Sequence, residues 1–122
     1  MGGHEPRPWT GVDLDGTLAQ YGEEPWDGIS IGKPVPLMVA LVKKLLKEGG
    51  EVRIFTARAS TVSHGIRGVQ KQREAIREWC VKHIGVELPV TCEKDYWLTR
   101  MYDDRCVQVE RNTGRLLSRR KA

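Results

Sequence analysis

Residues 12–17, Val-Asp-Leu-Asp-Gly-Thr, constrain this chain more than any other segment. They end an apolar run and continue into a Gly-Thr turn, so we expect a short strand to stop there. Side chains at i and i+2 of a strand point to the same side, which brings the carboxylates of Asp13 and Asp15 together. Neighbouring carboxylates repel each other until a cation or a shared proton lies between them. Oxygen ligands favour a hard cation, so the segment predicts a Mg²⁺ site.

The composition is ordinary for a globular protein, with 30% charged and 39% hydrophobic residues in 122 and a net charge of +4. We expect one domain over residues 1–122, with residues 1–8 and 118–122 as flexible tails. No apolar run approaches the ~20 residues of a membrane helix, and the N-terminus carries no hydrophobic signal. Three cysteines, an odd number, favour reduced thiols in a cytoplasmic protein. The basic C-terminus is more simply explained as a solvated tail than as a nucleic-acid contact.

Strand and helix patterns alternate along the chain. Helices are predicted over residues 34–48 and 69–84, each with apolar residues at helical spacing and a glycine stop. Strands are predicted over residues 9–13, 51–56, 89–92, 97–102 and 106–109, the last leading through a turn at 112–114 into a hairpin. Residues 59–68 are predicted to form a polar loop.

This alternation predicts parallel strands joined by right-handed crossovers, hence a three-layer α/β fold with a Rossmann-like sheet. Ligands of such sheets bind beyond the carboxyl ends of the strands. Asp13 ends the first predicted strand, Thr56 ends the second, and Asp103 and Asp104 follow the fourth. The sequence therefore predicts one site for a phosphate and a metal at this edge.

Residues 13–17, then Thr56, Lys94 and the pair Asp103-Asp104, resemble the four motifs of the haloacid dehalogenase superfamily in their usual order. The first motif is highly specific, whereas the single threonine and lysine gain weight from order and context. Most members of that superfamily are Mg²⁺-dependent phosphatases with a Rossmann-like fold. The resemblance therefore implies a hydrolase that acts on phosphate monoesters.

The residue types suit that chemistry. An aspartate nucleophile divides the slow hydrolysis of a phosphate monoester into two easier steps through an aspartyl-phosphate, and Asp13 is our candidate. Asp15 would act as the general acid and then the general base. The metal ligands would be Asp13, the backbone carbonyl of Asp15 and a carboxylate of the later acid pair. The resemblance favours Asp104 as the direct ligand, with Asp103 supporting it.

Positive and polar groups are also needed around a transferring phosphoryl group. The Thr56 hydroxyl is a candidate donor, although a threonine at a strand end also caps turns. Lys94 would supply a point charge, although its acidic neighbours also suit a solvated surface lysine. Arg58 offers a planar fork for a phosphate or for a surface acid. Arg105 is expected to pair with one of the acids or with substrate.

Two other classes of protein share parts of this pattern. Glycosyltransferases use Asp-x-Asp pairs, but they are usually much longer and lack the later threonine, lysine and acid pair. Receiver domains are phosphorylated on aspartate, but there the paired acids come early in the chain, and here they come last. A further alternative is a catalytically weak relative that binds a phosphorylated or nucleic-acid partner through the same site.

The intervals between the motifs leave no room for an inserted cap domain. One predicted helix fills each of them, so we expect a capless phosphatase with an open site. Such a site suits a large substrate, such as a nucleic-acid end or a phosphoprotein, unless a second subunit of a homo-oligomer covers it. The Thr-Ala-Arg and Asp-Asp-Arg segments also resemble those of phosphatases that act on nucleotides or polynucleotide 3′ ends. The short interval from Lys94 to Asp103 leaves no room for the helix usually found there.

Overall fold

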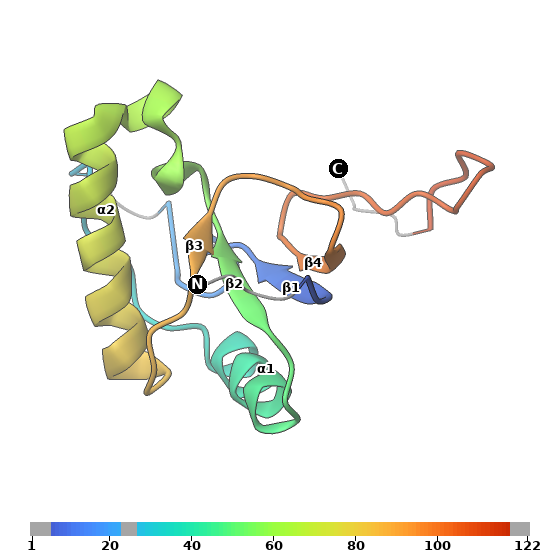
Figure 1. Ribbon diagram of the computed structural model, residues 1–122, viewed down its shortest axis with the longest axis horizontal. Coiled ribbons are helices and arrows are strands. Elements are labelled where there is room, and N and C mark those ends of the chain that lie inside the picture. The colour runs from blue at the N-terminus through green and yellow to red at the C-terminus, as the bar shows by residue number, and fades with distance from the viewer. Residues whose placement is uncertain (1–5, 23–26, 118–122) are drawn as a thin grey trace.

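The structure, a computed structural model, describes residues 6–22 and 27–117. Its centre is a parallel sheet with the spatial order β3-β2-β1-β4 (Figure 1). The strands are β1 (Trp9–Val12), β2 (Val52–Phe55), β3 (Val90–Thr91) and β4 (Leu98–Tyr102). The predicted α/β class with a Rossmann-like parallel sheet is confirmed, and the described residues contain no cap domain.

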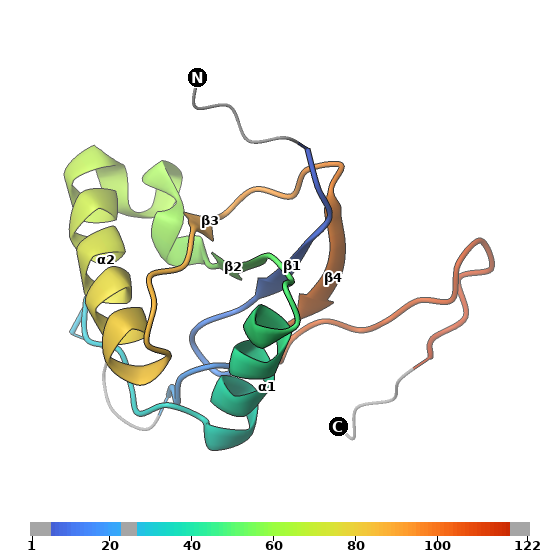
Figure 2. The same ribbon diagram turned by 60° about the horizontal axis from the view of Figure 1, so that its bottom comes forward.

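The two α-helices, α1 (Pro36–Lys47) and α2 (Thr61–His83), lie on the same face of the sheet (Figures 1 and 2). The chain steps in one direction from β1 to β2 and from β2 to β3, and right-handed crossovers in one direction place both helices on one face. Accordingly, Val12 of β1, Val42 of α1 and Ile76 of α2 are fully buried in one core cluster.

The opposite face of the sheet is crossed by the connection between β3 and β4, residues 92–97, instead of a helix. Trp9 is buried there, stacks near Phe55 with ring centroids 6.5 Å apart, and lies 4.4 Å below the Arg53 guanidinium. Its indole N–H donates to Asp95 of the connection at 2.8 Å. This connection thus crosses that face without a helix, which agrees with its short length in the sequence.

The prediction of a polar loop over residues 59–68 is wrong. A 3₁₀ turn occupies Ala57–Ala59, and α2 begins directly after Ser60, whose side chain accepts from the Ser63 amide. Gly65, with φ of 71°, interrupts the helix within this part. Hydroxyl residues and glycines suggest a loop, but serine also caps helices, and here the cap is what forms. The predicted apolar stripe farther along α2 is buried as expected.

The predicted fifth strand, residues 106–109, does not form. Within residues 106–117, a single antiparallel bridge, between Val109 and Leu116, joins the two sides of the C-terminal turn, where Asn112 adopts a left-handed φ of 69°. Residues 106–117 extend away from the sheet as an arm (Figures 1 and 2). A hairpin without a third strand or a covering helix forms few backbone pairs.

Most of the predicted tails, residues 1–5 and 118–122, lie outside the described residues. Within the described part of the first tail, Arg7 is exposed and forms an ion pair with Glu51 at 3.0 Å. None of the described helices is long and apolar enough to cross a membrane.

Candidate active site

Three carboxylates meet at the carboxyl edge of the sheet. Asp13 follows β1, and Asp103 and Asp104 follow β4, which pairs with β1 in parallel. The Asp13 amide donates to the Tyr102 carbonyl at 2.9 Å, which holds the ends of these two strands side by side. Each of the three acids offers an oxygen, and these oxygens lie within 4.8 Å of one another. The predicted convergence of Asp13 with Asp103 and Asp104 is confirmed, whereas the Asp15 carboxylate, which was predicted to lie beside that of Asp13, is not part of this cluster and pairs with Arg58.

A tight turn after β1 presents this first acid. The Leu14 side chain is fully buried, and its carbonyl accepts from the amides of Thr17, Leu18 and Ala19. Gly16 has a φ of +92°, which glycine adopts without strain. The apolar residue between the two acids thus anchors the turn in the core and leaves the acids on its outer side.

Thr17 is a site residue that sequence reasoning missed. Its hydroxyl lies 3.1 Å from the Asp104 carboxylate and 3.4 Å from that of Asp13, and it accepts from the Asp104 amide at 3.0 Å. It is almost fully buried. The signal was its position directly after Asp-Gly, where a hydroxyl can reach back to the acids. Thr17 therefore joins the two stretches that carry the cluster.

The carboxylate cluster disfavours ionisation of Asp13. Burial is the largest cause that raises the pKa of Asp13 from 3.8 to about 7, followed by the negative charge of Asp103 and the hydrogen bond and charge of Asp104. Such a raised pKa is expected when carboxylates converge without a compensating positive charge. The donor set of hard carboxylate oxygens and the unfavourable charge of Asp13 both fit a divalent cation such as Mg²⁺.

A Gly16→Ala substitution tests how tightly the turn is packed against the acids. An added Cβ would lie 2.8 Å from the Asp104 carboxylate and would be strained at this φ. We expect the substitution to lower the free energy of unfolding by ~1–2 kcal/mol and to weaken Mg²⁺ binding. Gly49→Ala is the matched control, because Gly49 has a φ of +87° but open space around it. Equal Mg²⁺ affinity of the two variants in calorimetry would contradict this packing.

A cleft of about 370 Å³ opens beside the cluster. The residues that line it come from the edge of the sheet and from the segments that follow β1, β2 and β4: Asp13, Asp15, Tyr21, Phe55, Thr56, Ala57, Arg58, His64, Asp103 and Arg105. Most of the predicted site residues therefore share one cleft. Tyr21 and His64 also belong to the lining.

Thr56 combines the two roles considered for it. Its hydroxyl oxygen accepts from the Arg58 amide at 3.1 Å and so caps the 3₁₀ turn. A hydroxyl that accepts one hydrogen bond still has its own hydrogen to donate. Because Thr56 also lines the cleft, that hydrogen is available to a ligand oxygen.

The two arginines of the prediction differ in exposure and partners. Arg105 is exposed and lines the cleft, and its guanidinium forms no ion pair within the described residues. Arg58 is 3% exposed, and its guanidinium forms a two-point ion pair with Asp15, with both distances 2.8 Å. Of the two roles considered for Arg58, the structure shows the pairing with an acid, while Arg58 also lines the cleft. Sequence spacing could not reveal this partner, because parallel strands bring the ends of β1 and β2 together without deciding which side chains pair there.

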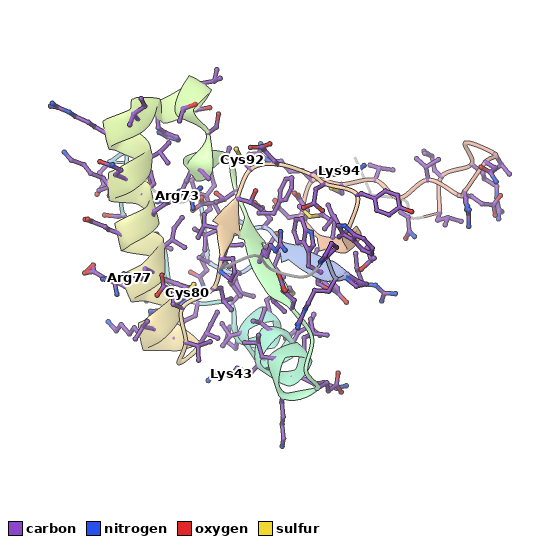
Figure 3. All side chains as sticks on the ribbon, in the orientation of Figure 1. Lys43, Arg73, Arg77, Cys80, Cys92 and Lys94 are labelled. Carbon is purple, nitrogen blue, oxygen red and sulfur yellow. The ribbon has the colours of Figure 1, made fainter. Side chains whose placement is uncertain are left out.

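Lys94 is not brought to the cleft. It is exposed on the connection between β3 and β4 (Figure 3) and is absent from the residues that line the cavity. The short connection crosses the face of the sheet through the hydrogen bond between Trp9 and Asp95, next to Lys94. Among the described residues, no contact supports a catalytic role for this lysine.

Comparison with solved structures finds a conserved protein from Bacteroides thetaiotaomicron with a similar fold. The two chains are 24% identical, the match covers 83% of this chain and 78% of the other, and the TM-score is 0.54. A likeness at this identity supports the fold alone. No family model matches the chain, and no curated protein matches it.

Proposed function

We propose that this protein is a Mg²⁺-dependent phosphomonoesterase that acts through a phosphorylated Asp13. The observation that carries the proposal is the convergence of Asp13, Asp103 and Asp104 beside a cleft that Asp15 and Thr56 also line. When bound between these carboxylates, Mg²⁺ would offset the negative charge that Asp13 and a phosphoryl group bring together.

In the first step, an oxygen of Asp13 forms a bond to phosphorus as the bond from phosphorus to the ester oxygen breaks. Asp15 gives its proton to the departing oxygen, which leaves as an alcohol. The Thr56 hydroxyl and the Arg105 guanidinium line the cleft and can donate to the phosphoryl oxygens. These donors stabilise the charge that spreads over those oxygens in the transition state.

In the second step, Asp15 takes a proton from a water molecule as the water oxygen bonds to phosphorus. The bond between phosphorus and Asp13 breaks, and inorganic phosphate and a free Asp13 carboxylate remain. The same group thus serves as acid and then as base. These two reaction steps need an acid beside the nucleophile whose carboxylate does not belong to the cluster of Asp13, Asp103 and Asp104. The Asp15 carboxylate lies outside that cluster.

The substrate class that we propose is a nucleotide or a polynucleotide end. The proposal is supported by a cleft without a cap domain in the described residues and by Arg105 and His64 in its lining. A homo-oligomer that covers the cleft stays a prediction, which sedimentation tests. A screen of nucleotides and 3′-phosphorylated oligonucleotides tests the substrate class.

Hydrolysis of 4-nitrophenyl phosphate tests the function itself. We expect turnover with Mg²⁺ and its loss in excess EDTA, with recovery when Mg²⁺ is restored. The Glu48→Gln variant, changed at an exposed acid after α1, should behave like the wild type. Turnover that persists in EDTA would exclude the metal-dependent reaction. Inorganic phosphate binding without turnover of any ester would instead identify a binding module.

A further inference from the structure

Arg58 is a buried cation whose hydrogen-bonding capacity is used within the protein. A guanidinium has five N–H donors. Two of them donate to the Asp15 carboxylate, two donate to the carbonyls of Ile29 and Ser30 at 2.8 and 2.9 Å, and one donates to Gln72 at 3.0 Å. A phosphate could reach this guanidinium only if one of these buried contacts broke.

Gln72 of α2 holds Arg58 from the other side. It is 3% exposed, accepts from Arg58, and donates to the Gly28 carbonyl at 2.6 Å. Farther along the helix, the Trp79 indole donates to the Gly32 carbonyl at 2.9 Å. One helix thus fastens residues 28–32 at several points, and the guanidinium lies between that segment and the Asp15 carboxylate.

A two-point ion pair sets the plane of a carboxylate as well as its position. Each carboxylate oxygen has about two lone-pair directions, so the pair with Arg58 leaves one direction on each oxygen of Asp15 for a proton or a substrate. Asp15 is 19% exposed and lines the cleft, which shows that this remaining side is accessible. Such fixed orientation is what a proton transfer to one ester oxygen requires.

We propose that Arg58, held by Gln72, is a positioning residue that aims the Asp15 carboxyl at the leaving-group oxygen, and that it does not bind the phosphoryl group. This inference rests on the proposed phosphatase function and assigns a task within it. Arg105 instead binds the phosphoryl group, because its exposed guanidinium has no ion pair in the described residues and lines the same cleft.

The test compares two esters that differ in their need for an acid. Phenyl phosphate has a poor leaving group, which needs the proton of Asp15, whereas 4-nitrophenyl phosphate has a good one, which hardly does. For Arg58→Lys we expect kcat to fall ~10²-fold or more on phenyl phosphate and within ~10-fold on 4-nitrophenyl phosphate. Inhibition by inorganic phosphate should remain unchanged. The substitution keeps a positive charge but cannot form the two-point pair.

Arg105→Gln is the matched control on the same cleft. It should raise KM and weaken phosphate inhibition for both esters, with little change in the ratio of their kcat values. Gln72→Met is the second variant, in case Arg58→Lys does not fold, and should show the Arg58 pattern in weaker form. In an Asp15→Asn background, Arg58→Lys should add no further dependence on the leaving group, because the two residues act as a unit.

Weakened phosphate inhibition in Arg58→Lys would show that Arg58 contacts the phosphoryl group and would overturn the inference. An equal loss of kcat on both esters, or no loss, would also overturn the inference, because neither result shows impaired proton transfer from Asp15 to the leaving group. A wild-type protein that hydrolyses neither ester rejects the proposed function and the inference together. That outcome is distinct from the others because it is seen before any variant is measured.

Discussion

The Asp13→Asn variant is expected to lose more than ~10⁴-fold in kcat and yet to be more thermostable than the wild type in EDTA at pH 8. The loss of turnover follows from the loss of the only proposed nucleophile. The gain in stability follows because the substitution removes a charge that the fold holds in an unfavourable place, while it keeps the shape of the side chain. Both effects come from one functional group.

The sign of the stability effect follows from the pKa of Asp13, which burial and the two neighbouring acids raise to about 7 in the folded state from 3.8. A carboxyl with a raised folded pKa contributes stability that is fully present below the unfolded pKa and is lost as the pH rises through the folded one. At pH 8 the folded wild type therefore carries an ionised Asp13 next to two other carboxylates, and the variant does not. The loss should develop between about pH 4 and 7.

Thermal melting of both proteins at pH 5 and pH 8 checks this prediction. In EDTA the variant should gain over the wild type mainly at pH 8, because Asp13 is largely protonated at pH 5. Adding Mg²⁺ should raise the Tm of the wild type and not that of the variant. A variant that melts at or below the wild-type temperature in EDTA at pH 8 would show that the cluster is not electrostatically strained.

Asp104→Asn is expected to raise the Mg²⁺ concentration for half-maximal activity by more than ~10–100-fold, the range found when a residue that only supports a metal ligand is lost. Asp104 lies close to Asp13, because the Thr17 hydroxyl is within 3.4 Å of both carboxylates. Asp103 has one oxygen that accepts from the Arg105 amide at 2.7 Å. Asp103→Asn should therefore have the smaller effect.

Mg²⁺ activation curves for the two variants, together with direct calorimetric titration, measure this difference. Thr17→Val supplies a further comparison, since it removes the hydroxyl without changing any acid. Its activation curve should lie between those of the wild type and Asp104→Asn. A larger shift for Asp103→Asn than for Asp104→Asn would reverse the assignment of the two acids.

Much of the fold was predictable because it depends on local patterns. The alternation of strands and helices and the stripe on α2 follow from the periodicity of apolar residues, and both agree with the structure. The convergence of Asp13 with Asp103 and Asp104 was also predictable, since parallel strands end at one edge of their sheet. The start of α2 was missed because Ser60 and the glycines near it suit either a cap or a loop.

That acids from two distant stretches meet could be inferred from the amino-acid sequence, because the order of the strands and their common direction require it. The packing of the folded chain was needed to show that Arg58 pairs with Asp15 and Gln72, that Thr17 lies between two carboxylates, and that Lys94 stays at the surface. These contacts depend on which groups lie within hydrogen-bonding distance of each side chain. A motif indicates where a strand ends. The partner of a long side chain depends on which carbonyls and carboxylates the packed segments bring within about 3 Å of it.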